Sequence, residues 1–186
     1  FDNDGIEVSS GYRYIWAPEI HRVGNYWVVY FTESHSSLFD IYCHALILDG
    51  SKDPYETALT SSSQASKWED YKMLASDDDA SGKISGKDIT PFKASFCLDM
   101  TYFKDEVNGK SYVIWAGKPV GNSDLFLAEV DEEQPWKLVS SCIRLTTPEY
   151  GWEKIRYQVN EGPTVLQKDG KIYMCFSNSG TGSEYS

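Results

Sequence analysis

The chain has 186 residues and a globular composition, with 41% hydrophobic and 24% charged residues. Its formal net charge of −11 argues against nucleic acids and anionic membranes as partners, because phosphate groups are bound by clustered Lys and Arg. There is no apolar run of about 18 residues, so no transmembrane helix is predicted. A neutral or cationic ligand fits the negative net charge better than an anionic one does. Aromatic residues make up 15%, with 6 Trp and 13 Tyr, which favours β-structure and flat platforms for ligands such as sugars.

The cysteines and histidines give no metal signature. The four cysteines are far apart in the sequence, without CxxC spacing, and the three histidines are scattered. Three of the cysteines lie in apolar strand-like runs, where Cys usually acts as a small buried hydrophobe. We therefore predict no metal ligands and no required cofactor, and the redox compartment stays open.

Three stretches of the chain repeat one pattern. Each has an acidic residue in a short apolar run, then a glycine-marked turn, then a strand of aromatic and β-branched residues. The acidic runs are residues 16–21, 96–103 and 159–166, and the strands that follow them are 26–31, 112–116 and 172–176. If the repeats face a common axis, their acids meet there at equivalent points, and this predicts a site.

Strand patterns dominate the rest of the chain as well. Third strands are expected at 40–48 and 124–130, and fourth strands at Trp68 and at 136–139. Units of four antiparallel strands, roughly 60 to 85 residues each, predict a β-propeller. We interpret residues 1–186 as one partial propeller domain that looks truncated at both ends, with a loop-rich insertion at about 60–93.

Glu161 and Asp99 are the strongest candidates for catalysis. Glu161 lies in an apolar strand before Gly162, and burial beside other carboxylates raises the pKa of a Glu, as a general acid requires. Asp99, between two apolar neighbours, suits a carboxylate that tunes the pKa of another. The alternatives are that Glu161 accepts hydrogen bonds from backbone amides at a strand end, and Asp99 from those of a turn.

Four further residues are candidates for binding a substrate. Glu19 could accept a hydrogen bond from a substrate hydroxyl, Trp16 and Trp115 could stack on a sugar ring, and Asn122 could reach a ligand from a loop tip. Core packing is the rival explanation for both tryptophans, and an ordinary structural role is the alternative for Glu19.

The order of five motifs resembles glycoside hydrolase family 43, nearest its branch of α-L-arabinofuranosidases and arabinan-degrading enzymes. The motifs are residues 15–21, 96–101, 122–125, 148–153 and 159–163, which run through nearly the whole chain. The resemblance implies a five-bladed β-propeller, of which this chain covers roughly the middle blades.

The resemblance also implies a hydrolysis with inversion of configuration that uses three acids. Glu161 matches the general acid, and Asp99 matches the aspartate that sets the pKa and orientation of that acid. The third acid, an aspartate general base, is expected ahead of Trp16. Asp2 and Asp4 lie in a hydrophilic turn rather than a strand, so neither is assigned. The family's last blade, whose axial histidine is often associated with a metal ion or water, is expected beyond the final residue.

These expectations lead to a first hypothesis: a glycosidase that releases terminal L-arabinofuranose from arabinan or arabinoxylan side chains. The alternatives are a β-xylosidase of the same family, a carbohydrate-binding propeller without activity, and a structural β-domain. The expected partner is an oligosaccharide or polysaccharide, and secretion or a periplasmic location follows only by analogy with polysaccharide degraders.

Overall fold

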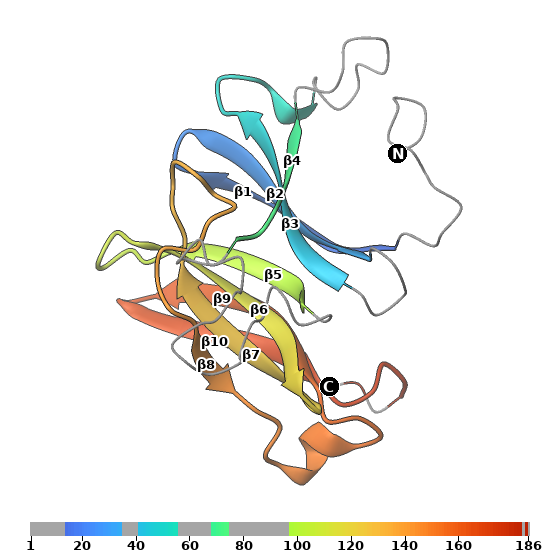
Figure 1. Cartoon of the computed structure of the whole chain (residues 1–186). Helices are drawn as coiled ribbons and strands as arrows, with labels where there is room; N and C mark the ends of the chain where they lie inside the picture. Colours follow the sequence, from blue (N-terminus) through green and yellow to red (C-terminus); the bar gives the residue numbers. More distant parts are fainter. Residues whose placement is uncertain (1–13, 35–40, 56–67, 75–96, 184, 186) are drawn as a thin grey trace.

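The computed structural model describes residues 14–34, 41–55, 68–74, 97–183 and 185. These residues form three antiparallel β-sheets and a short 3-10 helix, so the prediction of an all-β chain is confirmed (Figure 1). Within the described part of the chain, no helix has the length and apolar character needed to cross a membrane.

The first sheet has the strand order β1-β2-β3-β4. Its strands are β1 (Ile15–Val23), β2 (Tyr26–Ser34), β3 (Ile41–Asp49) and β4 (Glu69–Lys72). A two-residue turn joins β1 to β2, and Gly24 adopts φ +52° there. A Cβ on Gly24 would lie 2.6 Å from the carbonyl oxygen of Glu132, so both the backbone angle and the close approach of the second sheet's loop require glycine. The fourth strand expected at Trp68 is confirmed by β4.

The second sheet has the order β5-β6-β7-β8, and the third contains β9 and β10. The strands are β5 (Cys97–Lys104), β6 (Ser111–Val120), β7 (Asn122–Glu129), β8 (Ile143–Thr146), β9 (Asn160–Lys168) and β10 (Lys171–Asn178). The helix η1 (Gly151–Lys154) lies in the connection from β8 to β9. Figure 1 shows the three sheets following one another, with β5 between the first sheet and β9.

The prediction of a fourth strand at residues 136–139 is wrong, because β8 takes that position. Residues 136–139 make only isolated bridges, to Leu74 and to Val130. Leu138 is fully buried, and the Trp136 ring stacks on Tyr71 with centroids 3.9 Å apart. The apolar pattern of this segment therefore reflects packing against the first sheet rather than strand pairing.

The core consists of two apolar layers, one on each face of the second sheet. Between the first and second sheets, Tyr30 packs with Trp115 and Phe126. Between the second and third sheets, Ile114 and Leu125 pack against strands β9 and β10. Both faces of β6 are buried, which explains why its sequence reads as a continuous apolar run instead of an alternating one.

The cysteines follow this layering in part. Cys43 and Cys97 are fully buried, and their sulfur atoms lie 3.2 Å apart across the first and second sheets. Cys175 was expected to be buried too, but it is exposed. It alternates along β10 with Met174 and Phe176, which pack on the second sheet, so its side chain points to the opposite face.

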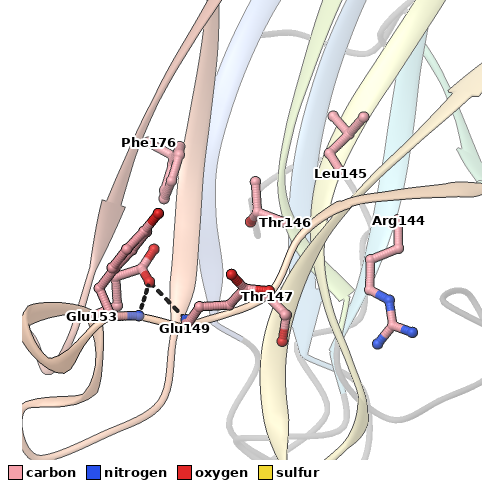
Figure 2. Close-up of a pocket in the computed structure, with 8 residues that line it drawn as sticks. Arg144, Leu145, Thr146, Thr147, Glu149, Glu153 and Phe176 are labelled. Carbon is pink, nitrogen blue, oxygen red and sulfur yellow. Dashed lines mark hydrogen bonds between the residues drawn. The ribbon is translucent and has the colours of Figure 1, made fainter.

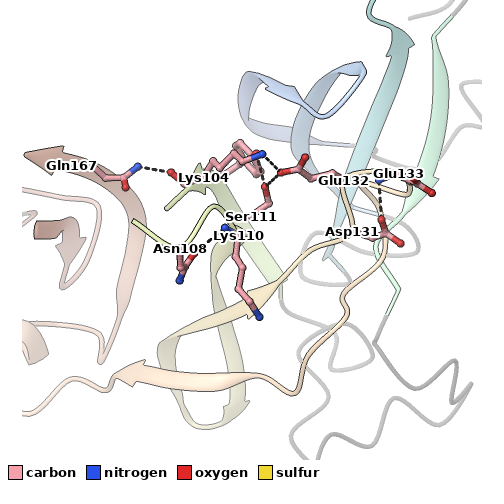
Figure 3. A network of polar contacts seen from close by, with 9 residues as sticks. Lys104, Asn108, Lys110, Ser111, Asp131, Glu132, Glu133 and Gln167 are labelled. Atoms are coloured by element: carbon pink, nitrogen blue, oxygen red, sulfur yellow. Dashed lines mark hydrogen bonds and ion pairs between the residues drawn. The ribbon is translucent and has the colours of Figure 1, made fainter. Parts of the chain in front are cut away.

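A polar network joins the sheets near the ends of β5 and β9 that lie away from the acids (Figure 3). The Lys104 ammonium lies 2.6 Å from the Glu132 carboxylate, which also accepts a hydrogen bond from the Ser111 hydroxyl at 2.5 Å. The Gln167 amide donates to the Lys104 carbonyl at 2.7 Å, which connects β9 to β5. These contacts fix the strands whose other ends carry the acids.

Most of the loop-rich insertion expected at about 60–93 lies outside the described residues, apart from β4 and the residues next to it. Asp2 and Asp4, neither of which was assigned as the general base, also lie outside the described residues.

Candidate active site

The site is built from the first strand of each sheet, because β5 lies next to both β1 and β9. Each of these strands carries the same irregularity, a β-bulge in which two residues face one residue of the partner strand. The first bulge residue has a left-handed backbone in all three: Ala17 at φ 46°, Asp99 at φ 54° and Gly162 at φ 59°. Such bulges re-aim side chains and are common next to active sites.

Each bulge lies opposite an aromatic residue of the neighbouring strand. The residues skipped by the pairing registers are Phe31 on β2, Trp115 on β6 and Phe176 on β10. The threefold repeat seen in the sequence is therefore a repeat of bulge geometry.

The sequence pattern suggested that the acids occupy equivalent points of the repeats, but in the structure they do not. Glu161 immediately precedes its left-handed residue, Asp99 is that residue, and Glu19 follows Ala17 by two positions. The acids nevertheless act on one another, because the charge of Asp99 raises the pKa of Glu161 and the charge of Glu19 raises that of Asp99. Asp99, on the second sheet, therefore interacts electrostatically with one acid of each neighbouring sheet.

Asp99 is held by one hydrogen bond on each side. Its Oδ2 accepts the N–H of Gly162 at 3.0 Å, and its own N–H donates to the Thr32 hydroxyl at 3.1 Å. Burial, and then the charge of Glu19, raise the pKa of Asp99 to about 6, although the hydrogen bond from Gly162 opposes the shift. The left-handed Gly162 thus ties Asp99 directly to the residue after Glu161.

Glu161 is the partly buried acid of the third sheet. Burial raises its pKa most, the charge of Asp99 raises it further, and a hydrogen bond with Tyr185 acts in the opposite direction. The Tyr185 side chain also forms a hydrogen bond with Ser177, the residue paired with Glu161 on β10. Tyr185 was not found by sequence reasoning, because no local pattern near the end of the chain connects it to Glu161.

Glu19 differs from the other two acids. Burial acts to raise the pKa of Glu19, but hydrogen bonds with His21 and Thr101 outweigh it, and the pKa is lowered. The Nε2 of His21 lies 3.0 Å from the Glu19 carboxylate, and the imidazole packs on the Tyr102 ring with centroids 5.3 Å apart. The site therefore combines one carboxylate stabilised in its charged form with two that retain protons to higher pH.

The expected ligand-binding residues have different surroundings. Trp16 is half-buried on β1 and stacks on Tyr14, with ring centroids 5.6 Å apart. Asn122 is half-buried at the start of β7. Trp115 is 0% exposed and lies in the core against Phe126, so neither face of its indole is open to a ligand. The expectation that Trp115 stacks on a sugar is corrected: the rival explanation, core packing, accounts for it.

One group of side chains among the described residues could hold a metal ion, and it includes none of the three acids of the candidate site. It consists of Glu33, His44 and Asp70, on β2, β3 and β4. The Nδ1 of His44 is 3.0 Å from Asp70, and its Nε2 is 3.9 Å from Glu33. The two carboxylates therefore face different ring nitrogens of His44.

Comparison with known proteins identifies the family. The sequence model of the glycosyl hydrolases family 43 matches residues 3–186. The chain belongs to this family. The propeller expected from the repeats agrees with this membership, and the family 43 assignment from the five motifs is confirmed.

Several known proteins are similar to this chain in sequence or in structure. An extracellular exo-α-(1→5)-L-arabinofuranosidase from Streptomyces chartreusis is 34% identical over 92% of this chain and 45% of its own length. An α-L-arabinofuranosidase B from Pyricularia oryzae is 30% identical over 95% of this chain and 32% of its own length. The crystal structure of an α-L-arabinofuranosidase from Lactobacillus brevis matches with a TM-score of 0.69 and 30% identity, covering 92% of this chain and 47% of that structure. The chain thus spans less than half the length of these proteins.

Proposed function

We propose that the protein is an inverting glycoside hydrolase that releases terminal L-arabinofuranose from arabinan or arabinoxylan side chains. In this proposal Glu161 is the general acid, and Asp99 sets its pKa and orientation. The observation that carries the proposal is the pairing of two partly buried carboxyl groups with raised pKa values, linked through the N–H of Gly162. Family membership and the arabinofuranosidase relatives support the substrate class.

The chemistry follows from the need to protonate a poor leaving group. The Glu161 carboxylic acid donates its proton to the glycosidic oxygen as the bond to the anomeric carbon breaks. A water molecule attacks that carbon from the opposite face and loses a proton to a general base. Inverting enzymes keep the two carboxyl groups roughly 6.5 to 9.5 Å apart to leave room for this water. We assign no residue as the base.

Asp99 contributes by keeping Glu161 protonated before the reaction. A negative charge beside a carboxyl group disfavours the loss of its proton, which is the direction that the charge of Asp99 gives to the pKa of Glu161. A general acid is most effective when its pKa lies near the working pH. Glu19, stabilised in its charged form, is suited to accept hydrogen bonds from sugar hydroxyls.

The test is Glu161→Gln in the complete protein, with Glu133→Gln as a control at an exposed glutamate. We expect turnover of arabinan to fall by about 10²- to 10⁴-fold in Glu161→Gln, the usual contribution of general acid catalysis. Hydrolysis of a dinitrophenyl arabinofuranoside should fall much less, because its leaving group needs no proton. Normal turnover of arabinan by Glu161→Gln would rule out the assigned role.

The alternative functions are separated by the wild-type protein. Faster hydrolysis of nitrophenyl xyloside than of nitrophenyl arabinofuranoside would indicate a β-xylosidase. Binding of arabino-oligosaccharides without any turnover would indicate a non-catalytic propeller.

A further inference from the structure

Two exposed aromatic rings stand together in the connection from β8 to β9. Tyr150 and Trp152 are 62% and 51% exposed, and their rings are stacked 5.9 Å apart with an interplanar angle of 8°. An isolated exposed aromatic residue is ordinary, but two exposed rings stacked on each other present a larger apolar surface than either ring alone. We call this pair the Tyr150–Trp152 platform.

The main chain that carries the platform is fixed on both sides. The buried Glu153 carboxylate, 4% exposed as a residue, accepts the backbone N–H groups of Glu149 and Tyr150, both at 2.7 Å (Figure 2). The Ser179 hydroxyl, just after β10, donates to the carbonyl of Trp152 at 2.5 Å. A platform on a fixed backbone loses little conformational freedom when a ligand binds.

A pocket of about 350 Å³ adjoins the platform, because Tyr150 is one of its lining residues. Figure 2 shows the pocket with Arg144, Glu149 and Phe176 among the labelled side chains around it. Its lining offers hydroxyl, carboxylate and guanidinium groups next to apolar side chains, namely Arg144, Leu145, Thr146, Thr147, Glu149, Tyr150, Glu153 and Phe176. Sugars present apolar ring faces and polar hydroxyls, so they are matched by such a combination of an aromatic face and hydrogen-bonding groups.

The pocket is connected to the candidate active site through two residues. Phe176 lines the pocket and is also the residue opposite the bulge that follows Glu161. Asn160, directly before Glu161, donates from its amide to the Thr146 hydroxyl of the lining at 2.9 Å. Figure 1 shows η1 at the same end of the third sheet as the beginning of β9. The pocket beside the platform therefore lies near the beginning of β9, the strand that carries Glu161.

We propose that the Tyr150–Trp152 platform and the adjoining pocket form an accessory saccharide subsite, which binds part of the polysaccharide beyond the residue that is released. The inference rests on the proposed function, because it takes the arabinose-containing chain as the occupant. A neutral saccharide also suits a protein with a net charge of −11 better than a polyanion does. The subsite holds the polymer by stacking and hydrogen bonds, and takes no part in breaking the bond.

The test compares a polymer with a small substrate in the complete protein. The variants are Trp152→Ala, its conservative partner Trp152→Phe, and Tyr157→Ala as the control on an exposed aromatic residue of the same connection that does not line the pocket. We expect Trp152→Ala to raise KM for linear arabinan about tenfold more than KM for nitrophenyl arabinofuranoside. Trp152→Phe should restore most of the affinity, and Tyr157→Ala should behave as the wild type.

Two other results are informative. If Trp152→Ala changes KM for both substrates equally, or for neither, the accessory subsite is ruled out while the proposed function stands. If the wild type hydrolyses neither substrate, the proposed function fails, and titration with arabinotriose then tests the platform by itself. Weaker binding by Trp152→Ala than by the wild type supports a saccharide subsite. Equal binding by both proteins, or binding by neither, excludes it. Melting temperatures of the variants confirm that they are folded.

Discussion

Asp99→Asn removes a buried negative charge from the candidate site and preserves the size of the side chain. The amide oxygen of Asn can accept the Gly162 N–H that the Asp99 carboxylate accepts at 3.0 Å. Asn also tolerates the left-handed backbone at this position, where φ is 54°. The substitution therefore isolates the effect of the charge, and we expect it to make the protein more stable at neutral pH while it impairs catalysis.

The size of the effect follows from the pKa. Burial, and then the charge of Glu19, raise the pKa of Asp99 from 3.8 to about 6. One pKa unit corresponds to about 1.36 kcal/mol, so ionising Asp99 is about 3 kcal/mol less favourable in the folded protein than in the unfolded chain. Because the folded state binds this proton more tightly, the stability it contributes is complete below pH 3.8 and is lost as the pH rises through about 6. Asn has no proton to lose.

The assay is urea unfolding, followed by tryptophan fluorescence, at about pH 3.5 and about pH 7.5. We expect the stability of Asp99→Asn relative to the wild type to rise by up to about 3 kcal/mol between the two pH values. Differences that do not depend on pH, such as backbone preference, cancel in this comparison. Asp49→Asn is the control, because Asp49 is exposed and hydrogen bonding to Ser51 lowers its pKa. Parallel pH dependence of Asp99→Asn and the wild type would refute the reasoning.

Three other predictions concern the surroundings of the site. Tyr185→Phe should raise the pKa of Glu161 and move the basic limb of the pH–rate profile to higher pH, because it removes a hydrogen bond that favours the charged carboxylate. The control Tyr173→Phe, at an exposed tyrosine, should leave the profile unchanged. Trp115→Ala should lower the free energy of unfolding by about 3–5 kcal/mol in urea, as expected for a large buried aromatic, and a change below about 1 kcal/mol would contradict its core position. Cys175 should be the first thiol to react with Ellman's reagent in the native protein, and equal rates for all four would show that the core does not protect the others.

The sequence by itself determined the type of fold, and it singled out the acids on which the proposed chemistry rests. The repeated acid, glycine and aromatic strand indicated sheets around shared acids, because each run has the residue types of a strand buried on at least one face. Glu161 and Asp99 stood out because a carboxyl group in an apolar run is unusual unless its environment is specialised. These features are local, so a single chain segment is enough to reveal them.

Only the tertiary structure decided how these residues meet. The bulges at Ala17, Asp99 and Gly162 offset the acids along their strands, and strand alternation gives no sign of such a shift. The burial of Trp115 likewise could not be predicted, since both faces of β6 are covered and an apolar run does not reveal which ring stays accessible. Tyr185 reaches Glu161 across 24 residues of sequence, a contact that depends on the path of the chain after β10. Contacts between distant segments arise from packing, which local sequence patterns do not encode.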